Sequence, residues 1–207
     1  MKLYIIRHGE TSWNKMRRMQ GRSDIELNEN GRALAEKTAW GMRNIPFDLA
    51  FTSPLGRAKE TARLVLGQRG IPVLEDERII EIGFGELEGT RWTEEDGAAG
   101  NERIYNFFHH PERYVPVQNG ETIEQLLART ADFMRDICSR RELENKTILV
   151  STHGAAARGL LNSLRTYEMS DFWHGGVAPN CGVAVVECTN GIPRLVQENI
   201  TYYQEKI

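Results

Sequence analysis

The chain has 207 residues, enough for one domain whose buried core needs no disulfide or metal to stabilise it. Its 26 Lys and Arg residues against 29 Asp and Glu residues give a net charge of −3, which argues against a broad nucleic-acid or membrane-binding surface. Three widely spaced cysteines without a CxxC pair argue against a disulfide framework or a zinc site and favour buried free thiols. Because we find no signal-peptide pattern near Lys2 and no apolar run of membrane-spanning length, we expect a cytoplasmic protein.

Strand and helix patterns alternate through the first half of the chain. In order, we predict a buried strand at 3–6 (LYII), a helix at 27–42 with Asn28 as its N-cap, a strand at 48–51, a helix at 53–66 and a short strand at 73–74. We expect Ser53 to cap the helix at 53–66, and Pro54 fits its first turn, where a missing N–H costs no hydrogen bond. A glycine-rich stretch, IIEIGFGELEG, follows at 79–89.

The second half begins with a polar stretch dotted with aromatic residues at about 90–120, which is typical of an inserted loop or lid. Thr122 and Gln125 match a capping box, which opens a helix that we predict to end near residue 143. In order, the remaining elements are a strand at 147–152, a helix at 154–164, and strands at 181–188 and 192–199 joined by TNG as a β-hairpin. This alternation predicts an α/β fold, a three-layer α/β/α sandwich with a largely parallel central sheet, formed by a single domain over residues 1–207.

Unusual polar residues fall where the predicted strands end. Arg7 and His8 follow the first strand, and Arg57 lies in the first turn after the second. His153 and Gly154 join the strand TILVST to its helix. Because the carboxyl ends of parallel strands lie together at one edge of a sheet, we expect these residues to share a crevice. Two guanidiniums, two imidazoles and helix N-termini together describe a pocket for a doubly charged oxyanion, most simply a phosphate.

Each of these residues also has a structural explanation when it is considered alone. Arg7 resembles an ordinary surface cation, Arg57 could pair with Glu60 or Glu10, and His153 could be a structural histidine. Their shared position at strand ends is what indicates a site. Ser12 and Ser53 invite comparison with serine hydrolases, but the chain has no GxSxG motif, so we reject that mechanism.

Four segments resemble the motifs of the histidine phosphatase superfamily, whose fold is phosphoglycerate-mutase-like. RHGETSWN at 7–14 resembles the RHGE signature, and TSPLGRAKETA at 52–62 resembles the motif that carries a second arginine. EIGFGELEG at 81–89 resembles the acidic motif, and VSTHG at 150–154 resembles the motif of the second histidine. The four occur in the order expected for the family, and the closing hairpin also fits.

The resemblance implies a covalent phosphohistidine mechanism without metal or cofactor. His8 would attack phosphorus through a neutral ring nitrogen while its other nitrogen donates to a backbone carbonyl. Crowding with Arg7, Arg57 and His153 is expected to keep His8 deprotonated, and the same groups would stabilise the charge on the transferring phosphoryl group. Glu81 matches the family's general acid and base.

Further residues match supporting positions of the family. Asn14 and Gly21 would contribute N–H groups to phosphate, although Gly21 is equally typical of an ordinary turn; Gly154 would line the phosphate site. Gly9 is expected to let the backbone turn behind His8. The remaining carboxylates divide into two groups: Glu10 and Glu121 match supporting positions, whereas Glu86 and Glu88 are expected to be solvated.

Three departures bear on the fate of the phosphate. Related phosphoglycerate mutases carry a lysine at the position of Trp92, a tyrosine at the position of Phe84 and an asparagine at the position of Ala155. We therefore expect a phosphatase acting on a small phosphorylated metabolite. The alternatives are a cofactor-dependent phosphoglycerate mutase, a phosphatase of phosphoproteins and a non-catalytic relative that binds phosphorylated ligands. The expected partner is a small phosphate ester, without nucleic acid or membrane, and the protein could form a homodimer.

Two segments that bear on substrate specificity each have two possible interpretations. The basic loop is either a solvated charged segment or a site for a second anionic group of the substrate; its cations are Lys15, Arg17, Arg18 and Arg22. The lid either contacts the alcohol portion of the substrate or simply packs over the core; its aromatic and imidazole residues are Trp92, Tyr105, Phe107, Phe108, His109 and Tyr114. We expect His109, His110 and His174 to be loop or helix-end residues.

Overall fold

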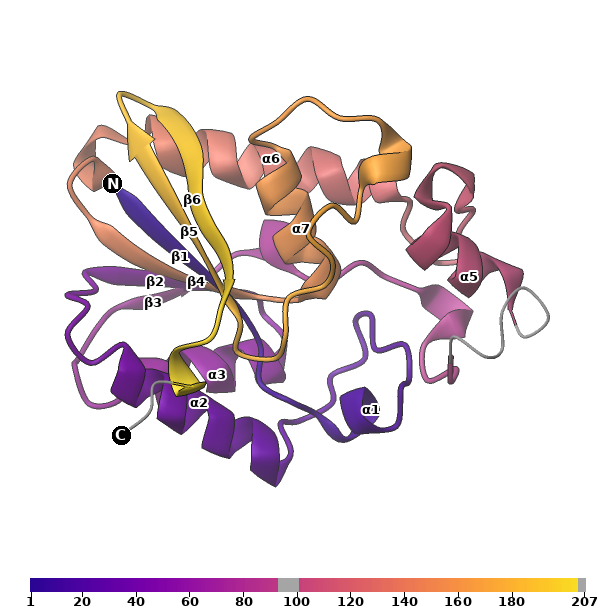
Figure 1. Ribbon diagram of the computed structural model, residues 1–207, viewed down its shortest axis with the longest axis horizontal. Coiled ribbons are helices and arrows are strands. Elements are labelled where there is room, and N and C mark those ends of the chain that lie inside the picture. Colours follow the sequence, from indigo (N-terminus) through magenta and orange to yellow (C-terminus); the bar gives the residue numbers. More distant parts are fainter. Residues whose placement is uncertain (93–100, 205–207) are drawn as a thin grey trace.

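One mixed sheet organises the computed structural model, which describes residues 1–92 and 101–204 (Figure 1). Its six strands lie in the order β3-β2-β4-β1-β5-β6. Their bounds are β1 Lys2–Arg7, β2 Leu49–Thr52, β3 Val73–Glu75, β4 Thr147–Thr152, β5 Val183–Thr189 and β6 Ile192–Ile200. β1 to β4 are mutually parallel, whereas β5 pairs antiparallel with both β1 and β6. The predicted strands are therefore present, and the sheet is largely parallel as expected.

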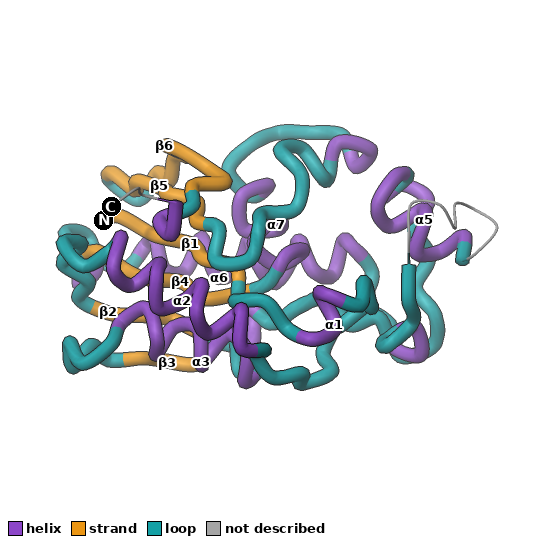
Figure 2. The backbone as a smooth tube through the Cα atoms, turned by 60° about the horizontal axis from the view of Figure 1, so that its bottom comes forward, coloured by secondary structure: helices purple, strands orange, loops and turns teal. Residues whose placement is uncertain are grey.

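Helices cover both faces of this sheet, which confirms the predicted three-layer α/β/α arrangement (Figure 1). α2 (Glu29–Gly41) and α3 (Gly56–Leu66) lie on one face, and α6 (Ile123–Ser139) and α7 (Gly154–Asn162) lie on the other. Figure 2 shows α1 (Ser12–Lys15) and α5 (Glu102–His109) beyond the strands instead of over a face of the sheet. No helix of the described ranges is long and apolar enough to span a membrane.

Side-chain alternation along the strands explains the two layers of core. In β1, Leu3 and Ile5 pack against α6 and α7, while Ile6 points to the opposite face against α2 and α3. In β4, Val150 joins the first cluster and Leu149 the second. A strand buried on both faces therefore reads as a continuous apolar run, as LYII and TILV do.

Two of the three predicted helix N-caps are confirmed. The Asn28 side chain accepts a hydrogen bond from the Gly31 N–H, and Thr122 forms a full capping box with Gln125. The predicted cap at Ser53 is wrong: α3 begins at Gly56, and the Ser53 hydroxyl is hydrogen-bonded to His153 instead. α6 also ends earlier than predicted, at Ser139, and a short 3-10 turn over Arg141–Leu143 continues the chain.

The insertion predicted at about 90–120 adds a third apolar cluster beyond the carboxyl ends of the strands. Residues 93–100 of that segment lie outside the described residues. The part that follows contains α5, whose N-terminus is capped by Asn101, and it buries Ile104, Phe107 and Tyr114 against Phe172. The cluster links the insertion to α6 and α7 and forms one side of the site described below.

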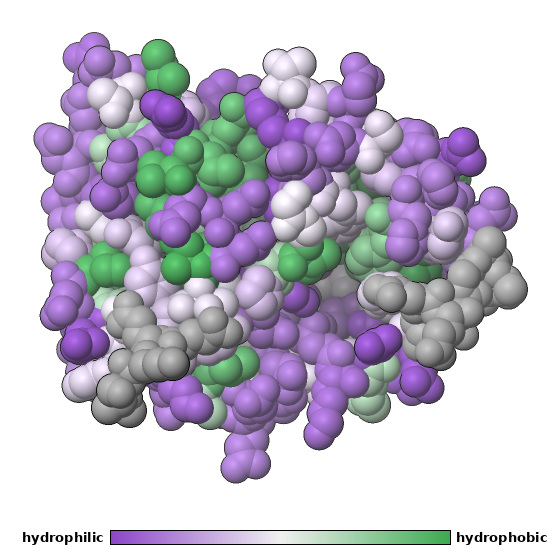
Figure 3. All heavy atoms as spheres, viewed as in Figure 1, coloured by the Kyte–Doolittle hydropathy of each residue, from purple (hydrophilic) through white to green (hydrophobic). Residues whose placement is uncertain are grey.

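The outer edge strand β6 is largely exposed. Figure 3 shows apolar side chains gathered over this edge of the molecule, and Ile192, Leu195 and Val196 are among the exposed large apolar residues. β6 and β3 form the two opposite edges of the sheet. β6 pairs antiparallel with its neighbour β5, whereas β1 to β4 form the parallel part of the sheet.

Candidate active site

The carboxyl ends of β1, β2 and β4 bring together five side chains that were predicted to be catalytic: Arg7, His8, Arg57, Glu81 and His153. The reason is the strand register. Arg7 of β1 lies opposite Thr152 of the neighbouring parallel strand β4, so the next residue of each strand leaves the sheet at the same edge. Those residues are His8 and His153, whose ring centroids lie 5.2 Å apart.

A cavity of about 500 Å³ opens at this cluster. Predicted site residues that line it are Arg7, His8, Asn14, Gly21, Arg57, Glu81 and Gly154. The rest of the lining is largely apolar: Met19, Phe84, Trp92, Phe107, Phe108, Ala155, Trp173 and Val177, together with Arg17, Arg18, Gln20 and Asn180. His153 is fully buried beside His8.

His8 is held in one tautomer. Its Nδ1 lies 2.7 Å from the carbonyl oxygen of Gly9, and because a carbonyl only accepts, Nδ1 carries the hydrogen. The His8 carbonyl in turn accepts from the Asn180 side-chain amide at 3.0 Å. Burial lowers the pKa of His8 well below its usual value, and the charges of Arg57 and Arg7 lower it further. His8 is therefore neutral with its lone pair on Nε2, and burial contributes more to this than the crowding of cations that was expected.

His153 is anchored through one ring nitrogen. Its Nε2 lies 2.7 Å from the Ser53 hydroxyl, and that hydroxyl also accepts from the Leu55 N–H at 3.3 Å. Burial again lowers the pKa of the ring well below its usual value, with Arg57 and His8 as further causes. Its Nδ1 is buried and has no hydrogen-bond partner among the described residues.

Two arginines are fixed by backbone carbonyls. Arg7 donates through Nη1 to the Ala178 carbonyl at 2.5 Å, and Arg57 donates to the carbonyls of Ser23 and Gly21, both at 2.7 Å. Burial lowers the pKa of Arg57 to about 10, so the group remains charged at neutral pH. Burial also lowers the pKa of Arg7 from its usual value.

Three buried polar atoms in this cluster have no partner within the described ranges: Arg7 Nε, Arg57 Nε and His153 Nδ1. An unpaired buried polar group costs free energy of about 1–3 kcal/mol, more when it is charged. Arg7, Arg57 and His8 line the same cavity, and the His153 ring lies beside His8, so an anion bound there would give these atoms a partner. The donors suit a tetrahedral oxyanion, because they come from the ends of β1 and β4 and from the first turn of α3.

Glu81 lies at the N-terminus of α7, where backbone N–H groups are free. Its carboxylate accepts from the Ala155 N–H at 3.2 Å, the Ala156 N–H at 3.0 Å and the Ile82 N–H at 3.0 Å. A Cβ placed on Gly154 would lie 3.7 Å from Glu81 Oε2 and 3.8 Å from Arg7 Nε. Gly154 therefore sits between the carboxylate and the guanidinium, and the helix terminus holds the carboxylate at the cavity.

Asn14 and Gly21 occupy the cavity wall in different ways. The Asn14 side-chain oxygen accepts from the Thr11 N–H at 3.0 Å, which leaves its amide hydrogens for the cavity. Gly21 has a φ of +52°, and a Cβ there would lie 2.2 Å from the Glu88 carboxylate. A glycine is thus required by the backbone and by close packing, and its carbonyl supports Arg57.

The expectation for Glu88 is wrong. Glu88 is not a solvated carboxylate: it accepts from the N–H groups of Arg22, Ser23 and Phe84 at 2.8, 2.8 and 3.2 Å. It therefore orders the segment whose carbonyls hold Arg57. The sequence offered no local signal for the contacts with Arg22 and Ser23, because these residues lie 66 and 65 positions away from Glu88.

Gly9 is also required for a different reason than predicted. Its φ lies outside the left-handed region, but a Cβ would lie only 2.7 Å from the Gly31 carbonyl oxygen of α2. Close packing of the loop after β1 on α2, and not a sharp turn, therefore excludes a side chain here. Glu10 accepts from the side chain of Asn28 at 2.7 Å, so it connects the same loop to the start of α2.

The basic loop is divided between two roles. Arg22 forms an ion pair with the buried Glu121, which also accepts two hydrogen bonds from Arg129. Arg17 and Arg18 instead line the cavity, and Arg18 donates to the Gly89 carbonyl at 2.6 Å. Ion pairing lowers the pKa of Glu121 although burial, the largest influence, opposes it. No role was predicted for Arg129, which is connected to this loop through its hydrogen bonds to Glu121.

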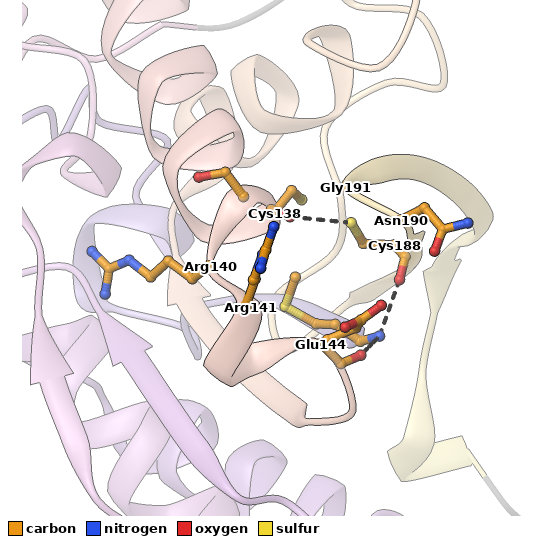
Figure 4. A pocket seen from close by; sticks show the side chains of 9 residues that line it. Cys138, Arg140, Arg141, Glu144, Cys188, Asn190 and Gly191 are labelled. Carbon is orange, nitrogen blue, oxygen red and sulfur yellow. Dashed lines mark hydrogen bonds between the residues drawn. The ribbon is translucent and has the colours of Figure 1, made fainter.

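A second cavity of about 510 Å³ lies at the opposite end of β1, around Met1, Cys138 and Cys188 (Figure 4). Cys188 Sγ lies 3.9 Å from the Cys138 carbonyl oxygen, to which it donates. All three cysteines are free and buried, as expected. Burial raises the pKa of Cys138 to about 12, so this thiol is a poor nucleophile. Within the described ranges, no three His, Cys, Asp or Glu residues cluster closely enough to hold a metal ion.

Comparison with known proteins agrees with this geometry. A sequence model of the histidine phosphatase superfamily (branch 1) matches residues 3–201. The chain is 33% identical over 165 residues to 2,3-bisphosphoglycerate-dependent phosphoglycerate mutase 2 of Gloeobacter violaceus, which covers 78% of this chain and 74% of that protein. Bacillus stearothermophilus YhfR has a TM-score of 0.88 at 31% identity, covering 98% of this chain and 99% of that chain.

A mutant phosphoserine phosphatase from Entamoeba histolytica, solved in complex with phosphoserine, has a TM-score of 0.82 at 31% identity, covering 98% of each chain. These similarities extend over the strand ends that carry His8, Arg57 and His153, and over the segment that carries Glu81. The chain belongs to the histidine phosphatase superfamily and has its phosphoglycerate-mutase-like α/β fold.

Proposed function

We propose that this protein is a metal-independent phosphomonoester hydrolase that acts on a small phosphorylated metabolite through a phosphohistidine. The observation that carries the proposal is the set of unpartnered buried atoms around a neutral His8: Arg7 Nε, Arg57 Nε and His153 Nδ1. A phosphoryl group in the cavity would satisfy all three. Fixed cationic side chains would then provide the charge stabilisation that many phosphoryl-transfer enzymes obtain from a metal ion.

In the first half-reaction, the His8 Nε2 lone pair attacks phosphorus and the bond from phosphorus to the alcohol oxygen breaks. The hydrogen bond from Nδ1 to the Gly9 carbonyl stabilises the positive charge that develops on the ring. Glu81 donates a proton to the departing alcohol oxygen. Arg7 and Arg57, held from behind by carbonyls, stabilise the charge on the phosphoryl oxygens without having to reorganise.

In the second half-reaction, water attacks phosphorus and the bond from phosphorus to Nε2 of His8 breaks. Glu81 accepts the proton of that water, which restores the carboxyl group to its starting state. Inorganic phosphate and neutral His8 are the products. Asn14 contributes an amide hydrogen to a phosphoryl oxygen, in line with its position in the cavity wall.

The cavity lining supports hydrolysis over mutase chemistry, although several relatives are phosphoglycerate mutases by name. A mutase must hold the substrate carboxylate and keep its phosphorylated intermediate. Three of the positions at which this chain departs from such mutases, Phe84, Trp92 and Ala155, lie in the lining. None of them offers a cation or an amide to a carboxylate.

The test is phosphate release in excess EDTA from 3-phosphoglycerate, sugar bisphosphates, nucleotides, ribazole phosphate and a chromogenic monoester. We expect release that His8→Ala abolishes and that the control His174→Ala, which changes an exposed histidine, leaves unchanged. Acid quenching should trap a phosphoryl group on the parent protein but not on His8→Ala. A metal requirement or full activity of His8→Ala would refute the proposal. Interconversion of phosphoglycerates without release would instead identify a mutase, and phosphate binding without turnover would identify a non-catalytic relative.

A further inference from the structure

The alcohol portion of the substrate can be inferred from the part of the cavity that does not hold phosphate. We infer that this part binds an aromatic ring, so that the substrate class is a phosphate monoester of an alcohol that carries a planar aromatic group. The inference rests on the proposed function, because it assigns the leaving group of the same site. It is carried by the arrangement of three rings: Trp92, Phe108 and Trp173.

These rings form a layered wall. Phe108 stacks on Trp92 with centroids 4.4 Å apart and planes inclined by 22°, and on Trp173 with centroids 5.7 Å apart and planes inclined by 25°. Trp173 is fixed in turn because its indole N–H donates to the Phe107 carbonyl at 2.7 Å. The wall is therefore preorganised, and a flat ligand ring can add to it in the offset or edge-on geometries that aromatic groups prefer.

Packing alone does not explain this wall. Phe107 is buried in the third apolar cluster and contacts Phe84 and Trp173 edge-on, which is the behaviour of a core residue. Trp92, Phe108 and Trp173 are only partly buried, and all three line the cavity. Exposed faces and edges of neighbouring large rings in a concave site are typical of ligand recognition.

The size of the cavity also supports a substrate with an aromatic group. About 500 Å³ is within the range of roughly 300–1,000 Å³ that is typical of sites for drug-sized ligands. A phosphate ester of a three-carbon acid would occupy the catalytic end and leave the ring wall uncovered. An aromatic alcohol would cover it.

Several polar side chains of the lining already have partners within the chain. Gln20 accepts from the Thr11 hydroxyl, Asn180 donates to the His8 carbonyl, and Arg18 donates to the Gly89 carbonyl. Arg17 is an exposed cation at the cavity. An ion pair at an exposed position is weak because water screens it. We therefore assign recognition of the alcohol to the rings.

The experiment compares 2-phenylethyl phosphate with ethyl phosphate, both esters of primary alcohols, so that the bond to be broken is equivalent. We expect kcat/KM to be at least tenfold higher for the phenylethyl ester, mainly through a lower KM. Phe108→Leu and Trp92→Leu, which keep apolar bulk but remove a ring, should reduce this preference to within about threefold, because they raise KM for the phenylethyl ester more than KM for ethyl phosphate. The control Trp40→Leu removes an exposed ring of α2 and should have no effect.

Equal kcat/KM for the two esters in the parent protein would overturn the inference, and so would variants that impair both esters equally. Binding of the same two esters to His8→Ala, measured by calorimetry, separates this outcome from failure of the proposed function. If the parent hydrolyses neither ester but His8→Ala binds the phenylethyl ester at least tenfold more tightly, the ring site stands and hydrolysis is refuted. Equal binding would refute the ring site whether or not the protein is a hydrolase.

Discussion

His8 and His153 lie side by side at the ends of two neighbouring parallel strands, with ring centroids 5.2 Å apart and planes inclined by 57°. Both rings are buried next to the guanidiniums of Arg7 and Arg57, and burial is the largest cause of the lowered pKa of each imidazole. Two imidazoles can therefore share a site with two cations, because both imidazoles are neutral. For His8 this makes the nucleophilic form the resting form.

This pairing predicts a dependence of stability on pH. Because the folded pKa of each histidine is below its unfolded value, the unfolded chain binds more protons as the pH falls below about 6.5. The free energy of unfolding should therefore fall between pH 6.5 and pH 5, by at most about 1.4 kcal/mol per pH unit for each histidine. Urea unfolding at pH 5, 6, 7 and 8 measures this slope. His153→Gln should reduce the slope and His174→Gln, at an exposed site, should not; equal slopes in all three proteins would contradict the prediction.

Glu81→Gln should slow hydrolysis in a way that depends on the leaving group. The amide cannot donate the proton of a carboxylic acid or take one from water, so we expect kcat/KM for ethyl phosphate to fall by about 10²- to 10⁴-fold. 4-Nitrophenyl phosphate should be less affected in its first half-reaction, because nitrophenolate departs without a proton. Single-turnover release of the alcohol measures this step. Glu86→Gln, at an exposed position of the same segment, is the control, and a uniform loss for both esters would argue against the role of Glu81 as acid.

Gly9→Ala should destabilise the fold. A Cβ at this position meets the backbone of Gly31 at 2.7 Å, and backbone cannot move aside as a flexible side chain can. We expect the free energy of unfolding to fall by about 1–3 kcal/mol, as for overpacked sites. The control is Gly56→Ala, where the nearest atoms belong to the side chain of Asp24 at 3.2 Å or more. Denaturant unfolding of both variants measures this difference. Equal decreases in the free energy of unfolding would show that contact with Gly31 is not the cause.

Arg158 and Glu198 should be energetically coupled. Arg158 is buried, pairs with Glu198 at 3.2 Å and donates to the Gly176 carbonyl at 2.8 Å, which holds the loop that leads to the carbonyl acceptor of Arg7. A cycle of Arg158→Leu, Glu198→Leu and the double variant should give a coupling free energy of about 0.5–3 kcal/mol, because each single change leaves a partly buried partner unpaired.

The matched control for that cycle is the exposed pair Lys2–Glu187, whose side chains are 42% and 50% exposed. Its coupling should be between about 0 and 1 kcal/mol, because water screens the charges. Similar coupling in the two pairs would show that burial of Arg158 contributes nothing.

The cluster of polar residues at the strand ends could be predicted because its members occupy positions that local patterns define. Apolar runs such as LYII and TILV indicate where strands end, and parallel pairing brings those ends together. Arg7, His8 and His153 follow directly from this reasoning. Asn28 and Thr122 likewise mark helix starts because a cap is a contact within four residues of chain.

Other parts of the site depend on contacts between distant segments, which leave no pattern in the sequence. Glu88 was expected to be solvated, yet it orders the loop that holds Arg57. Ser53 was expected to cap a helix, yet its hydroxyl binds His153, 100 positions away in the chain. In both cases a local preference for water or a helix end is outweighed by a buried partner that only the folded chain supplies.

The sequence by itself therefore determined the layered fold and the residues at the strand ends, because strand periodicity and helix caps act over short stretches of chain. Only the tertiary structure decided the tautomer of His8, the carbonyl supports of Arg7 and Arg57, and the wall of Trp92, Phe108 and Trp173. Each of these depends on where a backbone carbonyl or a ring face lies in space. That position is set by the packing of the whole chain.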